Sequence, residues 1–158
     1  MDFLKENFTS FKDSCIISIS NHIGVRESRK LVGEYVLTEY DLKNGVYFKD
    51  TIALGNYDID IHNPEGTGTE IFEFGEDDFY KIPYRSLLPK EYDNMLVAGR
   101  CLSATHKAHS AVRIMPICAC LGQAAGTAVA IAVSENKNMH TIDTDALRTK
   151  LAENGAAL

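Results

Sequence analysis

Hydrophobic and polar positions follow two different periods along the chain, and these periods predict its elements. Residues 57–62 (Tyr-Asp-Ile-Asp-Ile-His) alternate strictly, which is typical of a half-buried strand. Residues 114–133 form a long run of small and apolar residues, which predicts a helix. The expected strands are 15–20, 31–37, 57–62, 71–74, 79–84 and 95–98. The expected helices are 2–12, a short helix between Thr38 and Gly45, 114–133 and 144–153.

Capping residues support two of these helices. Thr38 and Asp41 have the spacing of a capping box, and Gly45 is a suitable end for a short helix. Asp143 directly precedes the last helix and is expected to cap it.

The segment from Asn94 to Val133 is the most informative part of the chain. A short apolar strand (95–98) stops at Gly99-Arg100, and a polar loop rich in His and Arg leads to the long helix. Helix N-termini carry unpaired N–H groups, and glycine allows close approach of a ligand to the backbone. The segment is therefore expected to hold an anionic cofactor.

The long helix carries a stripe of small residues at Gly122, Gly126 and Ala130, which share one helix face. Glycine inside a helix costs about 1 kcal/mol relative to alanine, so the stripe calls for a packing reason. Two interpretations are open: close packing on a sheet without a ligand, or packing against a cofactor.

Composition narrows the function classes. A net charge of −6 argues against a nucleic-acid partner. No secretory signal is visible, and the four cysteines form no C-x-x-C pair, so a cytoplasmic location is expected. The apolar helix is long enough to span a bilayer, but Pro116 and two glycines favour a buried helix of a soluble protein, with no membrane partner.

Four stretches together resemble a family of FAD-dependent oxidoreductases, which has the broad two-domain architecture of glutathione reductase. They are IGVRESRKLVGEYVLTEYDL, YDIDIH, IPYRSLLPKEYDNMLVAGR and AGRCLSATHKAHSAVRIMPICACLGQAAGTA, in the family's order. The last stretch looks like the family's carboxy-terminal signature. The resemblance covers nearly the whole chain.

The resemblance implies an α/β fold class (α+β in the first lobe): the C-terminal portion of an FAD/NAD(P)-binding-type fold with part of an antiparallel-sheet substrate domain. Such proteins begin with a G-x-G-x-x-G turn, which this sequence lacks; Gly66-Thr67-Gly68 is a near miss with no helical pattern after it. The chain is therefore expected to be a C-terminal part, with a substrate-domain portion at 1–90 and a return into the FAD-binding domain at 91–158. The missing N-terminal FAD-binding half would then be a partner, and FAD binding by this part alone is doubtful.

The resemblance also implies the cofactor-binding residues. Ala98, Gly99 and Arg100 would end a strand beside the FAD, with the last two near its ribityl-pyrophosphate section. The start of the helix around Ile114, Met115 and Ile117 would direct backbone N–H groups at the flavin pyrimidine ring, stabilising reduced flavin.

The catalytic candidates are His106, His109 and Arg113 in the polar loop, and Arg26 and Arg29 in GVRESR, where Glu27 is able to pair with either arginine. Histidine titrates near neutrality, and arginine binds carboxylates by two parallel hydrogen bonds. Taken singly, the two histidines and Arg113 are equally well explained as loop residues that hydrogen-bond the backbone. The charges of GVRESR are also typical of an ordinary solvated turn. As a cluster, the two histidines and Arg113 are expected at the flavin edge.

No metal site is expected. Asp58, Asp60 and His62 share one strand face, which more often meets water than a metal; His62 is an outside candidate for the substrate pocket. The cysteine spacings do not support an iron–sulfur cluster, and Cys118 and Cys120 are expected to be small buried hydrophobes.

The predicted function is hydride transfer from an unidentified small organic substrate to flavin by an FAD-dependent oxidoreductase. The alternative is a non-catalytic binding or interaction module that does not hold FAD by itself.

Overall fold

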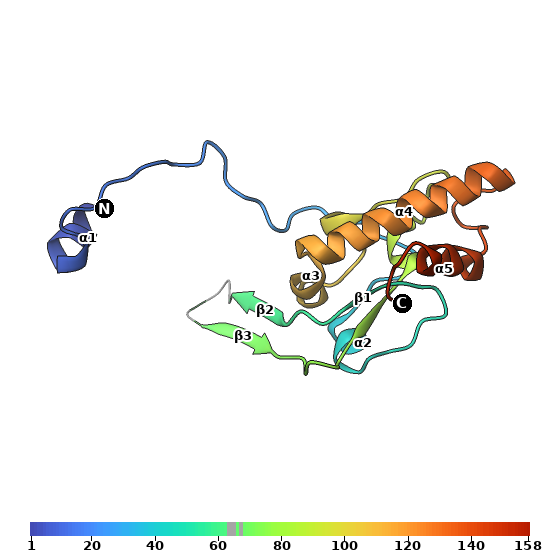
Figure 1. Ribbon diagram of the computed structural model, residues 1–158, viewed down its shortest axis with the longest axis horizontal. Helices are drawn as coiled ribbons and strands as arrows, with labels where there is room; N and C mark the ends of the chain where they lie inside the picture. The colour runs from blue at the N-terminus through green and yellow to red at the C-terminus, as the bar shows by residue number, and fades with distance from the viewer. Residues whose placement is uncertain (63–65, 67) are drawn as a thin grey trace.

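A long helix packs against one of two short strand pairs, and the other pair lies beside a short helix that precedes the long one, as the computed structural model in Figure 1 shows. The structure describes residues 1–62, 66 and 68–158. The α-helices are α1 (Asp2–Asn7), α2 (Glu39–Lys43), α3 (His106–Val112), α4 (Met115–Glu135) and α5 (Thr144–Glu153). The strands are β1 (Thr51–Gly55), β2 (Ile59–His62), β3 (Thr69–Phe72) and β4 (Tyr80–Pro83). Three 3₁₀-helices are η1 (Thr9–Phe11), η2 (Tyr84–Leu87) and η3 (Gly99–Cys101).

The strands form two antiparallel pairs. β1 pairs with β4 from Thr51↔Pro83 to Gly55↔Tyr80, with a register shift after Thr51. β2 pairs with β3 from Ile59↔Phe72 to His62↔Thr69. This mixture of helices and small antiparallel sheets agrees with the predicted α/β class at the coarse level. Most of the predicted turn at 63–69 lies outside the described residues.

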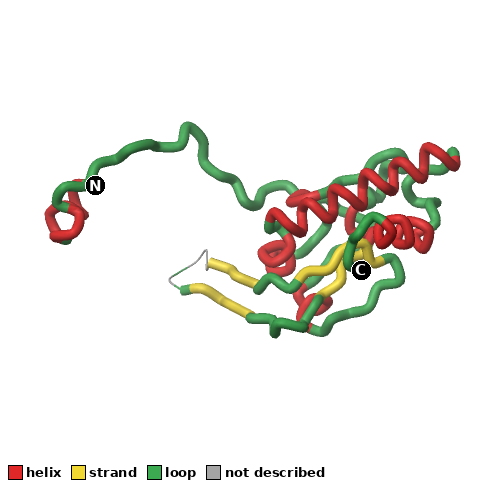
Figure 2. Tube along the Cα trace, in the orientation of Figure 1, coloured by secondary structure: helices red, strands yellow, loops and turns green. Residues whose placement is uncertain are grey.

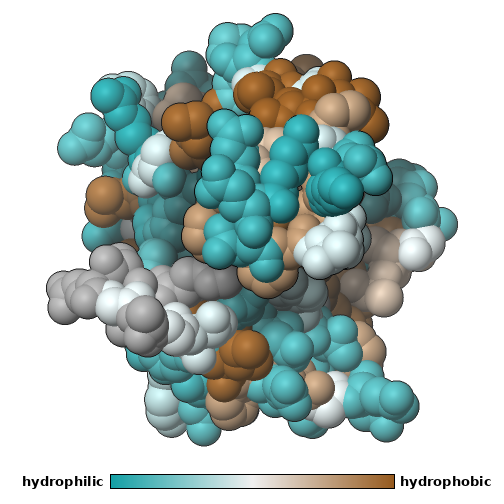
Figure 3. Space-filling model, turned by 90° about the vertical axis from the view of Figure 1, so that its left-hand side faces the viewer, coloured by the Kyte–Doolittle hydropathy of each residue, from teal (hydrophilic) through white to brown (hydrophobic). Residues whose placement is uncertain are grey.

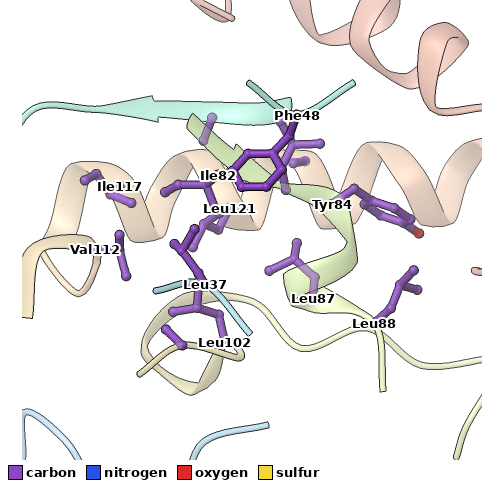
Figure 4. Packing of buried hydrophobic residues seen from close by; sticks show 14 of the residues in the cluster. Leu37, Phe48, Ile82, Tyr84, Leu87, Leu88, Leu102, Val112, Ile117 and Leu121 are labelled. Atoms are coloured by element: carbon purple, nitrogen blue, oxygen red, sulfur yellow. The ribbon is translucent and has the colours of Figure 1, made fainter. Parts of the chain in front are cut away.

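One hydrophobic core joins α4 to the strands and to η2 (Figure 4). Leu37, Ile82 and Leu87 from the first 90 residues contribute to the same cluster as Leu102 and Leu121 from the remainder. Because residues from both sides of residue 90 share this core, the packing does not test the predicted division into two parts, which stays a prediction.

α4 confirms the predicted helix at 114–133, but only one of its faces is buried. Its buried residues are Ile117, Leu121, Ala124, Ala128 and Ala132. Of the two interpretations of the small-residue stripe, close packing on a sheet of this chain is wrong: Gly122, Gly126 and Ala130 are exposed, and a Cβ at either glycine would meet nothing within 4 Å. By length and composition α4 is able to cross a membrane; only 28% of its most apolar 18-residue window is buried.

The N-terminal segment projects away from the body (Figures 1 and 2). The predicted helix at 2–12 is confirmed as α1 followed by η1. The predicted strand at 15–20 is wrong, because this segment finds no strand to pair with and Ile17 is 95% exposed. Figure 3 views the molecule from this end, where brown apolar patches lie among hydrophilic side chains.

Other differences also reflect long-range pairing. The expected strand at 31–37 forms only two isolated bridges, Gly33↔Pro89 and Leu37↔Ala104. The expected strand at 95–98 is a loop with one backbone bond from Val97 N–H to the Leu87 carbonyl at 2.9 Å. β1 was not predicted at all, and β3 begins two residues earlier than expected.

The predicted helix caps are confirmed. The Thr38 and Asp41 side chains each accept a hydrogen bond from the other residue's backbone N–H, which completes the capping box of α2. The Asp143 carboxylate accepts from the N–H groups of Asp145 and Ala146 at 2.9 and 3.3 Å.

Candidate functional site

A cavity of about 760 Å³ opens at the N-terminal end of α4. Its volume lies within the range of small-molecule and cofactor sites. Three guanidinium groups and one carboxylate are among its lining residues. The lining consists of Arg26, Tyr57, Asp60, Arg100, Ser110, Arg113, Ile114, Met115, Pro116 and Cys118.

The start of α4 brings free backbone donors to this cavity. Ile114 is the N-cap, and no side chain caps the helix. The first N–H groups of any α-helix have no partner within the helix, and they carry the positive end of its dipole. Pro116 has no N–H, so the uncapped donors of the first turn include those of Met115 and Ile117.

A short helix lies in front of α4, where the sequence predicted a polar loop. α3 packs against β2, and the Thr105 hydroxyl caps it by accepting from the Ala108 N–H at 3.3 Å. Arg113 and Ile114 alone connect α3 to α4, and Arg113 is therefore held at the cavity. His106 and His109 are thus helical residues, not loop residues.

Glu27 is the centre of the predicted catalytic cluster. Its carboxylate contacts Lys30 Nζ at 2.6 Å and His106 Nδ1 at 2.8 Å. His109 Nδ1 lies 3.4 Å and Arg113 Nη1 3.8 Å from the same carboxylate. Both histidines and Arg113 therefore lie around one carboxylate, and Glu27 links them; the catalytic roles expected of these residues stay predictions.

The surroundings of Glu27 favour its charged form. Burial by itself raises the pKa of this carboxyl. Hydrogen bonds from Lys30 and His106, with the charges of Lys30 and His109, outweigh burial and lower the pKa from 4.5 to about 2. Glu27 is therefore a carboxylate throughout the range in which an enzyme works.

His109 is fully buried, with a side-chain exposure of 0%. Its Nε2 lies 2.8 Å from the Arg100 carbonyl oxygen, which only accepts, so Nε2 carries the hydrogen. Nδ1 has no hydrogen-bond partner in the described part of the chain. Burial lowers the pKa of His109, although the Arg100 carbonyl and the Glu27 charge act in the opposite direction. His109 therefore ties η3 to α3 and does not reach the cavity, whereas His106 is 57% exposed.

The arginines of the sequence prediction lie around the same region. Arg26 and Arg100 line the large cavity and also a smaller adjacent hollow of about 160 Å³, which includes Arg29. Arg100 Nη1 donates a hydrogen bond to the Val25 carbonyl oxygen, which joins the N-terminal segment to η3. Neither Arg26 nor Arg100 pairs with a carboxylate among the described residues.

The predicted cofactor-binding residues separate into two groups. Arg100, Ile114 and Met115 line the cavity. Ala98 is the N-cap of η3 and Gly99 its first residue, and η3 contacts α4. Gly99 has φ +79°, and a Cβ there would meet nothing within 4 Å. The Ile117 side chain belongs to the core at 4% exposure, so only its backbone is available to a ligand.

Sequence reasoning missed the contribution of β2 to the cavity. Strand alternation placed Asp60 on a polar face, but that face was expected to meet water. Asp60 lines the cavity, and its Oδ1 is buried without a hydrogen-bond partner in the described part of the protein. Asp58, two residues earlier, accepts instead from the Phe74 N–H at 2.9 Å. Of His62, the third member of that face, only the backbone of β2 is described.

The cysteines are separate and free. Cys118 is half-buried and lines the cavity, and burial raises the pKa of its thiol. Cys120 is exposed, so its prediction as a buried hydrophobe is wrong. Among the described residues, no three His, Cys, Asp or Glu side chains gather in a way that would hold a metal ion.

Comparison with known proteins identifies the family. No curated protein and no solved structure matches the chain. The sequence profile of the family described as FAD dependent oxidoreductase matches residues 1–151. Since this match covers nearly all of the 158 residues, the chain belongs to the FAD-dependent oxidoreductase family.

Proposed function

We propose that the cavity at the start of α4 is the flavin and substrate site of an FAD-dependent oxidoreductase. The observation that carries this proposal is the meeting of an uncapped helix N-terminus with three arginines in one cavity. Bound FAD would supply the acceptor for a hydride from an organic substrate.

The residues of the site fit a flavin. The uncapped N–H groups of Met115 and Ile117 suit the electron-rich pyrimidine edge of the ring. Gly99 leaves open space where a side chain would stand, so a ligand is able to approach the backbone there. The fit supports the roles assigned to Ala98, Gly99, Arg100, Ile114, Met115 and Ile117.

The substrate would be a small anion held by Arg26, Arg100 and Arg113. His106, exposed and bonded to the Glu27 carboxylate, is the better candidate for moving a proton. His109, being buried, positions Arg100 from behind. Arg29 lines the neighbouring hollow and adds positive charge close to the site.

A partner region with a G-x-G-x-x-G turn would complete the FAD site, since this sequence has none. The exposed stripe of α4 and the apolar residues of the N-terminal segment suit contact with such a region. The same surfaces favour a second candidate function: a non-catalytic module that binds another polypeptide and no FAD by itself.

Proline substitution at the start of α4 tests the flavin site. Met115 is the first helical residue, where proline is accepted, and Ile114 has φ −68° and ψ 152°, which suits a residue before proline. Met115→Pro removes one free N–H without removing a helix bond. Thr144→Pro makes the same change at the start of α5 and serves as the control.

FAD is titrated into each protein while flavin fluorescence and the thermal midpoint are measured. Because this chain would hold only the flavin end of FAD, we expect weak binding by the wild type and Thr144→Pro, seen as quenched flavin fluorescence and a gain in thermal stability at high FAD concentration, and about tenfold weaker binding by Met115→Pro. No response from the wild type would contradict FAD binding by this chain and favour the module. Equal binding by both variants would remove the helix N-terminus from the site.

A further inference from the structure

Of the described residues that line the arginine-rich cavity, Asp60 is the one carboxylate. Burying a carboxylate oxygen without a hydrogen-bond donor is costly, and buried polar groups are normally paired. Asp60 Oδ1 is buried and lacks a donor, as far as the described residues extend. The carboxylate also forms no ion pair with Arg26, Arg100 or Arg113 in that part of the chain, although all four side chains line one cavity.

Opposite charges that share a cavity without pairing leave room for a ligand between them. A carboxylate only accepts hydrogen bonds, so Asp60 requires a donor from the ligand. Guanidinium groups only donate, and they bind carboxylates in a bidentate manner. The ligand must therefore present an anionic group at one end and a hydrogen-bond donor near it.

The net charge of the cavity lining decides whether the hydrogen-bond donor of the ligand is an ammonium or a hydroxyl group. The three arginines outnumber Asp60, so the lining is net positive even though Glu27 lies 3.8 Å from Arg113. An ammonium group would be repelled by this excess, whereas a hydroxyl group is neutral and donates equally well.

We infer that the cavity binds 2-hydroxy acids, with the arginines holding the carboxylate and Asp60 accepting the hydrogen bond of the hydroxyl group. This inference rests on the proposed function for the identity of the site, and it adds the substrate class and a residue that the sequence reading placed in solvent. Asp60 thereby becomes the residue that determines specificity for the hydroxyl group.

Three acids that differ only at the 2-position test the inference. Mandelate carries a carboxylate and a 2-hydroxyl group, phenylacetate lacks the hydroxyl group, and phenylglycine replaces it with an ammonium group. Binding of each probe to the full chain is measured by calorimetry without FAD. One hydrogen bond to a charged group predicts that mandelate binds about tenfold more tightly than phenylacetate.

Substitutions then show which residue causes the preference for mandelate over phenylacetate. Asp60→Ala should bind both acids equally, and Asp60→Asn, which keeps the shape of the side chain, should reduce the preference to about threefold or less. Asp58→Asn removes the same charge from a residue that is not in the cavity lining, so it should keep the tenfold preference. Arg26→Gln should weaken the binding of mandelate and of phenylacetate by a similar factor.

The outcomes separate this inference from the flavin proposal. Equal binding of mandelate and phenylacetate by the wild type, tighter binding of phenylglycine, or an unchanged preference in both Asp60 variants would overturn the inference. The FAD titration measures the binding of a different ligand. If FAD does not bind but the protein prefers mandelate in a way that depends on Asp60, the flavin proposal is refuted and the inference about the substrate class is not.

Discussion

Replacing Glu27 with glutamine should destabilise the protein, and the loss should depend on pH in a defined direction. Glu27→Gln keeps the shape of the side chain but removes the charge that meets Lys30, His106, His109 and Arg113. The pKa of Glu27 falls from 4.5 to about 2 on folding, and this difference corresponds to about 3 kcal/mol. Because His106 is 57% exposed, solvent screens part of this energy, and we expect about 1–2 kcal/mol at pH 7.

The sign of the pH dependence follows from the lowered pKa. The contribution of Glu27 is fully present above pH 4.5, where the carboxyl group is ionised in both states. Between pH 4.5 and about 2 the unfolded chain binds a proton that the folded chain does not, so the contribution is lost as the pH falls. The difference between wild type and Glu27→Gln should therefore shrink over this range.

Urea denaturation followed by circular dichroism at pH 7, 4 and 3 gives the free energy of unfolding. Glu153→Gln is the control, because its pair with Lys150 is exposed at 59% and 56%. It should change stability by less than about 0.5 kcal/mol at every pH. The reasoning about the cluster would be refuted if Glu27→Gln were as stable as the wild type at pH 7, or if the difference grew towards acid.

Two glycine substitutions make opposite predictions for stability. Gly126→Ala should stabilise the chain by up to about 1 kcal/mol, because the site is exposed and alanine is the better helix former; thermal or urea unfolding that shows a loss would mean that this face is covered in solution. Gly55→Ala should destabilise it by about 1–3 kcal/mol, because a Cβ there would lie 2.5 Å from Tyr80 Cε2 and 2.7 Å from Ile117 Cδ1; unchanged urea unfolding would contradict this packing.

Local signals in the sequence predicted the elements that local forces decide. Asp143 caps α5 at the predicted position, and Thr38 with Asp41 forms the predicted capping box, because a cap is complete within a few residues. The span of α4 was predicted because a run of good helix formers needs no distant partner to define its period.

Elements that need a distant partner were predicted poorly. Residues 15–20 have a strand pattern but pair with nothing among the described residues, and 31–37 makes only two bridges. A strand is defined by the hydrogen bonds that it forms with neighbouring strands, and the sequence does not say which segments will pair. For the same reason, the sequence did not reveal that the small-residue face of α4 is exposed in this chain.

By itself, the sequence determined the family, the long helix with its preceding glycine turn, and the residue types of the site. Only the tertiary structure decided which of these residues meet: Glu27 joins the histidines, His109 is buried, and Asp60 enters the arginine-rich cavity. The physical reason is that residue type and spacing act along the chain, whereas burial and charge pairing depend on segments far apart in sequence. Glu27 and His106 are 79 residues apart, yet their side chains lie 2.8 Å from one another.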